Sequence, residues 1–307
     1  MRISIIGQAA FGEATFQRLL KEHEVVAVSA PASVAGGRPD PLWQAAETAG
    51  IALVPTASLR TDAGLDAWRQ AAADLAVMAF VTDILPAAVF AIPARGTIQY
   101  HPSLLPLHRG SSAMNWPIIH GERESGLTIF WPDQGVDTGP VLLQKRVSIG
   151  PDDTMGSLYF DRLFPMGVEA IAEAAKLVAE GRAPAIPQRH EDATYEPPCR
   201  DAHAKIAWHG PAQRVYDHIR GCTPQPGAWT PFEGQPLRIS ECRLIGEGVP
   251  GSPGRVLAVG ETTIDIRLNG GVLRVQRVQP AGGKKVGAAE WARSAGVQPG
   301  HRFRESQ

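Results

Sequence analysis

Short apolar runs alternate with helical spacing over roughly the first hundred residues. The runs "RISIIG", "EVVAVSA", "IALVP", "DLAVMAF" and "GTIQYH" have the length of buried strands, and "FGEATFQRLLKE" and "DPLWQAAETAG" have the spacing of helices. In the second helix, Asp40 is placed to be the N-cap and Pro41 to be the first helical residue. This alternation predicts a Rossmann-like α/β domain with a mostly parallel sheet.

The pattern changes twice further along the chain. "LTIFW" and "PVLLQKRVSI" flank the loop "PDQGVDTG" and predict antiparallel edge strands, and a long helix is expected to begin at Asp152, Asp153 or Thr154 and to end at Gly181. Residues 183–204 are rich in proline and charge, as in a linker on the surface. The helix "GPAQRVYDHIRG" and several short strands separated by glycines then predict a small β-barrel (OB-like) domain. We therefore expect a catalytic domain over 1–204, including the linker, and a small barrel domain over 205–307.

Composition narrows the class of protein. The 307 residues suffice for two domains, and the net charge of -1 indicates no overall attraction to nucleic acid or membrane. Residues from 205 onward hold 14 Lys and Arg against 8 Asp and Glu, which is a mild sign of a polyanionic partner. The three cysteines form no CxxC pair, and the first residues are only briefly apolar. We expect a cytoplasmic protein that does not span a membrane.

His101 is the first candidate for chemistry. It ends a predicted strand and leads into the stiff turn "SLLP", and ligands of open α/β sheets bind beyond the carboxyl ends of strands. Gln99 lies two residues earlier, so its amide and the imidazole point to the same side of the sheet. Such a pair suits a developing oxyanion. The alternative is a core histidine with satisfied hydrogen bonds beside a half-buried glutamine.

Asp137 lies in "DQGVDTG", between two predicted strands. A turn aspartate commonly makes a local hydrogen bond, but one that reaches His101 would fix the imidazole and serve as a base. Other catalytic motifs are missing. His101, His108 and His120 lack the spacing of metal ligands, no GxSxG occurs, and "GQAAFG" lacks the GxGxxG spacing of dinucleotide-binding loops. We expect no metal and no nicotinamide cofactor.

Three segments together resemble a known family. "YHPSLLPLHRGSSAMNW", "IFWPDQGVDTGPVLLQK" and "PDDT" are similar to the folate-dependent formyltransferases, and the resemblance extends over about the whole chain. The "HPSLLPLHRG" and "FW" variants resemble most the amino-terminal hydrolase domain of 10-formyltetrahydrofolate dehydrogenases. The resemblance implies a Rossmann-like domain that binds folate, followed by a small barrel-like domain.

The resemblance also implies roles for particular residues. His101 and Asp137 match the family's catalytic histidine and aspartate, and "FVTDILP" matches its pterin-binding loop, so Asp83, Ile84 and Leu85 are expected to contact the pterin. Gln99 departs from the pattern, because the transferases carry asparagine there and the hydrolase domain carries an apolar residue. We include Gln99 among the expected catalytic residues, because its amide could be a second donor beside the imidazole of His101.

These matches predict the reaction. The formyl group of 10-formyltetrahydrofolate is attacked at its carbonyl carbon, and tetrahydrofolate leaves. With water as the acceptor the protein is a 10-formyltetrahydrofolate hydrolase, which is the prediction. With an amine it is an N-formyltransferase acting on an amino sugar, another small amine or methionyl-tRNA. The stretch "APASVAGGRPDPLW" has one arginine where bacterial tRNA-formylating enzymes carry a basic insertion, which argues against tRNA. The third hypothesis is a folate-binding protein without activity.

Overall fold

The computed structural model describes residues 1–32, 37–246 and 250–303, which form two compact units. The first unit consists of residues 1–113, 126–147 and 160–196, and the second of residues 114–125, 148–159 and those from 197 onward. Each unit is thus assembled from segments that are separate in the sequence. The functional boundary predicted between residues 204 and 205 stays a prediction.

The first unit is built on a mostly parallel sheet with the strand order β3-β2-β1-β4-β5-β6-β7. The strands are β1 (Arg2–Gly7), β2 (Glu24–Ala30), β3 (Ala52–Pro55), β4 (Leu75–Ala79), β5 (Thr97–His101), β6 (Glu124–Phe130) and β7 (Val141–Ser148). β1 to β5 pair in parallel, whereas β6 runs antiparallel to β5. The predicted Rossmann-like domain is confirmed.

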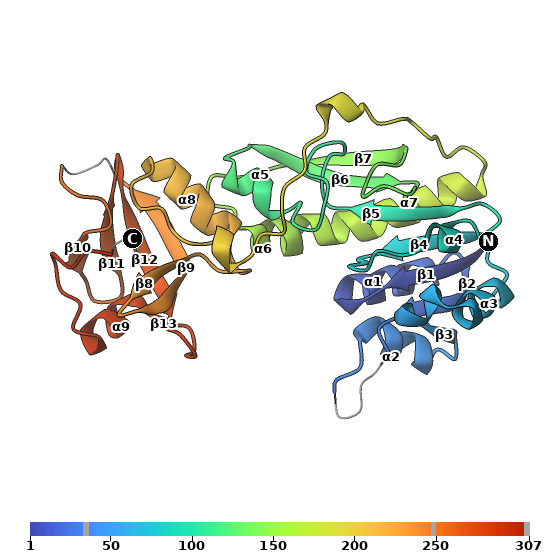
Figure 1. Ribbon diagram of the computed structural model, residues 1–307, viewed down its shortest axis with the longest axis horizontal. Coiled ribbons are helices and arrows are strands. Elements are labelled where there is room, and N and C mark those ends of the chain that lie inside the picture. The colour runs from blue at the N-terminus through green and yellow to red at the C-terminus, as the bar shows by residue number, and fades with distance from the viewer. Residues whose placement is uncertain (33–36, 247–249, 304–307) are drawn as a thin grey trace. The chain divides into compact units, whose positions relative to one another are not determined.

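Both faces of this sheet are buried, and helices cover each of them (Figure 1). The helices of this unit are α1 (Ala9–Leu19), α2 (Pro41–Thr48), α3 (Asp62–Gln70), α4 (Ala87–Phe90) and α7 (Phe164–Ala179). Side chains alternate along β1, so Ile5 joins one apolar core with Phe16 and Ile171, while Ile6 joins another with Trp68. Strands buried on both faces explain why their sequences are continuous apolar runs.

Asp40 begins α2 as predicted, and it also holds the loop after β1. Its Oδ1 accepts a hydrogen bond from Leu42 N at 2.9 Å, which is the N-cap, and its Oδ2 accepts one from Ala9 N at 2.8 Å. Ala9 has a positive φ of 57°, a conformation that non-glycine residues adopt only where the surroundings hold it. One carboxylate therefore connects the starts of two helices.

The long helix expected after residue 152 is divided into parts. Of the three predicted caps, Thr154 is the one used: its side chain accepts from Ser157 N at 3.0 Å, in a capping box that begins α6 (Met155–Leu158). A π-helical turn, Tyr159–Leu163, separates α6 from α7. Gly181 follows α7 with a positive φ of 69°, as expected of a glycine just beyond a helix end.

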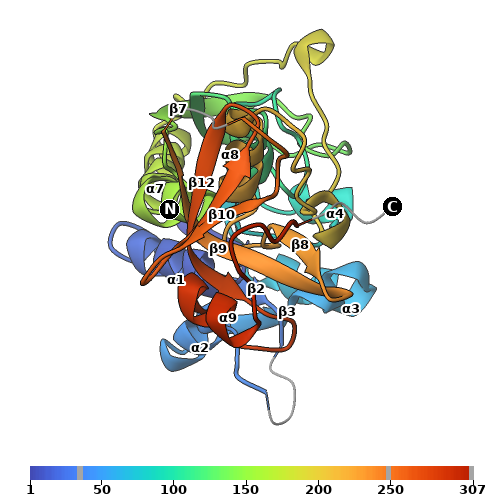
Figure 2. The ribbon, with the colours of Figure 1, turned by 90° about the vertical axis from the view of Figure 1, so that its left-hand side faces the viewer.

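The second unit contains a curled antiparallel sheet that forms a half-barrel (Figure 2). Its strand order is β10-β11-β12-β9-β8, with β13 paired to β12. The strands are β8 (Trp229–Phe232), β9 (Gln235–Ile245), β10 (Val256–Val259), β11 (Ile264–Leu268), β12 (Gly271–Gln279) and β13 (Val286–Gly287). The helices are α5 (Asn115–Ile119), α6, α8 (Ala212–Gly221) and α9 (Ala288–Ser294).

Helices pack on this sheet from two places in the chain. The predicted α8 packs on β9 and β12, and α9, which was not predicted, packs on β11 to β13. The predicted barrel-like second domain is confirmed. No helix within residues 1–32, 37–246 and 250–303 is long and apolar enough to cross a membrane.

Candidate functional site

Strand β5 carries His101 to the carboxyl end of the parallel part of the sheet. Gln99 pairs with Met78 of β4 on one side and with Phe130 of β6 on the other, and His101 pairs with Thr128. His101 is only 5% exposed. The predicted place of this histidine is therefore the observed one, at the edge of the sheet where open α/β folds bind ligands.

The turn after His101 is fixed by side chains rather than by a helix or strand. Ser103 Oγ donates to Leu107 O at 2.6 Å, and Thr128 Oγ1 donates to Ser103 O at 2.7 Å. Thr128 Oγ1 also accepts from Leu105 N at 3.1 Å. These bonds curl the chain so that the carbonyl of His108 returns to the imidazole of His101.

Each imidazole nitrogen of His101 faces an oxygen atom. Nε2 lies 2.9 Å from His108 O, and Nδ1 lies 3.6 Å from Asp137 Oδ2. A carbonyl oxygen can only accept, so Nε2 carries hydrogen and donates. The distance from Nδ1 to Asp137 Oδ2 exceeds that of a hydrogen bond, so the two groups form an ion pair only when the imidazole is protonated. The structure thus brings His101 and Asp137 together, as the sequence predicted.

Hydrogen bonds hold the loop that carries Asp137 in place. Asp137 has a positive φ of 56°, and its side chain is 9% exposed. Its Oδ2 accepts from Gly110 N at 2.8 Å, and this bond ties the "DQGVDTG" loop to the turn that follows β5. Asp133 Oδ1 accepts from Gly135 N at 3.0 Å within the loop. Within this loop the local hydrogen bond is made by Asp133, while Asp137, for which a local role was the alternative, lies beside His101.

Gln99 is half-buried on the strand that ends at His101. Its place two residues before His101 puts both side chains on the same side of β5. Among the residues that the structure describes, none is hydrogen-bonded to the Gln99 side chain. Its amide is therefore available to a ligand, although its role stays a prediction.

The three residues expected to contact a pterin differ in what they can offer. They lie between β4 and α4, where Arg60 holds the loop: a guanidinium nitrogen donates to Ile84 O at 2.8 Å and lies 3.9 Å from Asp83. Ile84 is 79% exposed, whereas Leu85 is buried in the core beside the sheet. Ile84 therefore presents an apolar side chain, and Leu85 has only its backbone to offer.

Sequence reasoning missed two buried polar residues that support the Asp137 loop. Arg109 and Gln188 are both almost fully buried and are hydrogen-bonded to each other. Gln188 lies in the segment that was predicted only as a surface linker. "HRG" was part of the family motif, so Arg109 had a signal, but no pattern around Gln188 marks it.

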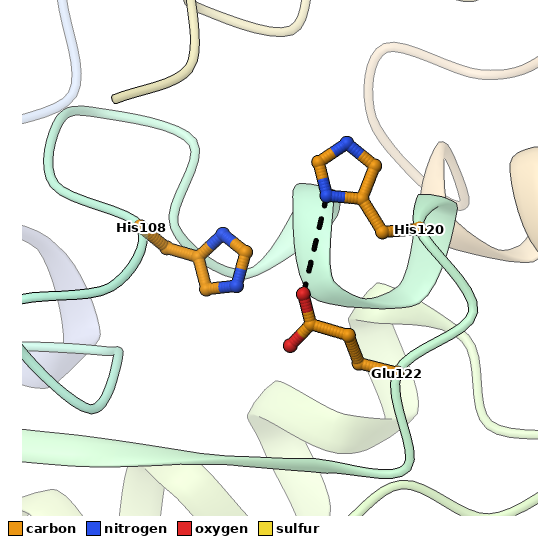
Figure 3. Close-up of side chains that lie close together, drawn as sticks. All are labelled: His108, His120 and Glu122. Atoms are coloured by element: carbon orange, nitrogen blue, oxygen red, sulfur yellow. Dashed lines mark ion pairs between the residues drawn. The ribbon is translucent and has the colours of Figure 1, made fainter. Parts of the chain in front are cut away.

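The other histidines considered as ligands have carboxylate neighbours in their own units. In the second unit, His120 Nδ1 lies 4.0 Å from Glu122 Oε1, and both side chains are partly exposed (Figure 3). In the first unit, His108 Nδ1 lies 3.1 Å from Glu196 Oε1. Within each unit these are pairwise acid–histidine contacts.

Two family models match the chain, one for each end. The model described as formyl transferase matches residues 1–174, and the model for the formyl transferase C-terminal domain matches residues 199–296. The site residues described above lie within the first match, except Gln188 and Glu196, which lie between the two matches.

Individual relatives agree with these matches. The chain is 37% identical over 95% of its length to the mitochondrial 10-formyltetrahydrofolate dehydrogenase of Mus musculus, and it spans 33% of that protein. It therefore covers only about a third of the length of these dehydrogenases. The methionyl-tRNA formyltransferase of Desulforamulus reducens is 32% identical over 98% of the chain and 96% of the relative.

A solved structure shares the fold. HypX from Aquifex aeolicus, in complex with tetrahydrofolic acid, superposes with a TM-score of 0.71 at 20% identity, over 96% of this chain and 47% of HypX. At that identity the likeness concerns the fold alone.

Proposed function

This chain belongs to the formyl transferase family of enzymes, as its motifs predicted, and from this we propose that it hydrolyses 10-formyltetrahydrofolate to formate and tetrahydrofolate. The observation that carries the proposal is the pair of His101 and Asp137 at the carboxyl end of β5, 3.6 Å apart. Both residues lie in the segment that matches the formyl transferase model, residues 1–174.

In the proposed mechanism, the charged imidazole of His101 stabilises the oxyanion. Nε2–H is already donated to His108 O, so the formyl oxygen approaches Nδ1–H, which Asp137 does not hydrogen-bond at 3.6 Å. The Asp137 carboxylate stabilises the imidazolium and accepts a proton from the attacking water. The C–O bond forms, the bond between the formyl carbon and N10 breaks, and the proton passes to N10 as tetrahydrofolate leaves.

We place the pterin against the loop after β4. Ile84 would cover one face of the ring, because its side chain is 79% exposed beside a loop that Arg60 holds in place. Asp83 and the backbone of Leu85 would supply polar partners. No metal is required, because the charge that develops on the formyl oxygen is met by the imidazolium and by the amide of Gln99.

We propose water as the acceptor, and the similarity to a methionyl-tRNA formyltransferase makes an amine the alternative. Identity to the dehydrogenases, at 37%, exceeds identity to the methionyl-tRNA formyltransferase, at 32%. The chain nevertheless covers 96% of the latter, so an N-formyltransferase acting on an amino sugar, another small amine or methionyl-tRNA is the second candidate. The same histidine and aspartate serve either acceptor, so the distinction rests on the assay.

The test is to mix the purified protein with 10-formyltetrahydrofolate without any amine and to measure formate and tetrahydrofolate together. Equal amounts of both products, at a multiple of the enzyme concentration, support the hydrolase. A second set adds methionyl-tRNA or an amino sugar nucleotide. Turnover only in that set, with formamide as product, supports the transferase, and saturable folate binding without turnover in either set supports the non-enzymatic folate binder.

A further inference from the structure

Gln188 connects the candidate site to a segment that neither family model covers. The models match residues 1–174 and 199–296, and Gln188 lies between them. Its side-chain amide donates to Asp137 O at 3.0 Å and to Gly139 O at 2.7 Å. Its Oε1 accepts from Arg109 Nη2 at 2.6 Å. All the hydrogen-bonding capacity of this amide group is directed at the two loops that form the site.

Arg109 holds the Gln188 side chain in place. It is only 3% exposed, its guanidinium donates to Tyr195 Oη at 2.6 Å, and it lies 5.2 Å from the centre of the Tyr195 ring. Its backbone N–H donates to Thr194 O at 3.0 Å, and Nη2 lies 3.2 Å from His190 Nδ1. Because Arg109 is fixed from several directions, it fixes the position of the Gln188 amide.

Such support stabilises the conformation of Asp137. Its φ of 56° is in the left-handed region, which is uncommon for residues other than glycine, and local hydrogen bonds favour it in aspartate. The carbonyl of Asp137 is the group that Gln188 holds, at 3.0 Å, and the same residue's carboxylate faces His101. The orientation of that peptide therefore sets where the carboxylate lies.

We propose that Gln188 is a positioning residue for Asp137: it holds the left-handed peptide so that the carboxylate stays beside His101. The inference rests on the proposed function, because it assigns Gln188 to the same site. The hydrogen bonds of the Gln188 side chain go to Asp137 O, Gly139 O and Arg109, so we assign its effect on the reaction to Asp137.

Gln188→Glu is the variant that best separates the positioning of Asp137 from the contact with Arg109. It keeps the shape of the side chain and the oxygen that accepts from Arg109, but it replaces the donor to Asp137 and Gly139 with a carboxylate oxygen. That oxygen would face two carbonyl oxygens at 2.7 and 3.0 Å, which is repulsive. If Gln188 served only to satisfy Arg109, the new charge would strengthen that contact and activity would be unchanged.

We expect Gln188→Glu to lower kcat by about 10- to 100-fold, the scale of a misplaced catalytic group, with the KM for folate nearly unchanged. The matched control is Arg189→Gln, since Arg189 is the next residue, is exposed, and pairs with Glu191 outside the site. The decisive measurement is the kcat of the double variant that combines Gln188→Glu with Asp137→Asn. Because Gln188 acts through Asp137, adding Gln188→Glu to Asp137→Asn should cost little more. The proposal is wrong if the two losses in kcat multiply in the double variant, or if a folded Gln188→Glu protein keeps the wild-type kcat.

A second readout does not depend on turnover. Gly110 N–H donates to Asp137 Oδ2 at 2.8 Å, so its amide NMR resonance reports the position of the carboxylate. It should shift in Gln188→Glu but stay in place in Arg189→Gln, and an unmoved resonance refutes the positioning role. Should Gln188→Glu not fold, Gln188→Met removes the donors without adding charge and carries the same tests. An inactive wild-type protein would refute the proposed function alone, because the Gly110 resonance still tests Gln188.

Discussion

Replacing Asp137 by asparagine removes the charge beside His101 and little else. Asparagine has nearly the same shape, and its side-chain oxygen can still accept from Gly110 N, now 2.8 Å from Oδ2. The hydrogen bond from the Gln188 side chain to the backbone oxygen of Asp137 is also kept. The change therefore removes the charge of the carboxylate and its capacity to accept a proton, while the hydrogen bonds that hold the loop stay in place.

The geometry gives the size of that contribution. At 3.6 Å, with both side chains less than a tenth exposed, the attraction is about 4–5 kcal/mol for an effective dielectric constant of about 20. Since a tenfold rate change corresponds to about 1.4 kcal/mol, loss of this attraction alone would lower kcat by at most roughly 1000-fold. The loss of the proton acceptor acts on the same step. We expect kcat for 10-formyltetrahydrofolate hydrolysis to fall by about 100- to 1000-fold.

The assay compares kcat, folate affinity and the free energy of unfolding in Asp137→Asn and in a matched control. Asp133→Asn removes a charge from the same loop but keeps the oxygen that accepts from Gly135 N, so its kcat should stay within about threefold of wild type. Folate affinity should be nearly the same in all three proteins. A folded Asp137→Asn protein that binds folate normally and turns over at the wild-type rate would remove Asp137 from the mechanism.

Three further predictions concern other parts of the chain. If the Gln99 amide donates to the formyl oxygen, Gln99→Leu should lower kcat by about 100- to 1000-fold with folate affinity unchanged. A wild-type kcat in this variant would show that Gln99 only lines the site. Asp40→Ala removes the acceptors for Leu42 N and Ala9 N and should lower the free energy of unfolding by about 2–3 kcal/mol in urea denaturation, whereas a change below about 0.5 kcal/mol would contradict the double cap. Initiator methionyl-tRNA should not form a tight complex at physiological salt; saturable binding there, weakened steeply by added salt, would favour the transferase.

Local signals explain what the sequence predicted correctly. Asp40 and Thr154 cap helices through bonds to residues two or three positions away, so a short stretch of sequence contains both partners. His101 was placed correctly because an apolar run defines the end of its strand. Asp137 was paired with His101 through the family motifs, since 36 residues separate the two and no periodicity connects them.

What was missed has weak local signals or distant partners. Helix α9 has seven residues and no side-chain cap, so it lacks the length and pattern that a prediction from the sequence needs. Gln188 lies 51 residues from Asp137 and 79 from Arg109, in a stretch whose composition is typical of a surface linker. A buried polar residue of this kind is identified by its partners, which only the fold brings together.

The chemistry of the site and its choice of acceptor therefore depend on different residues. The motifs around His101 and Asp137 determine which groups can stabilise an oxyanion and accept a proton, and this chemistry is the same for water and for an amine. The acceptor must then depend on residues beside the pair, and Gln99 is the position where this chain departs from both patterns that it resembles. Gln99→Asn restores the transferase-type amide on a shorter arm, so comparing its ratio of formamide to formate with that of the parent tests where the choice of acceptor is made. A changed ratio at similar folate affinity assigns the choice to this strand, and an unchanged ratio assigns it elsewhere.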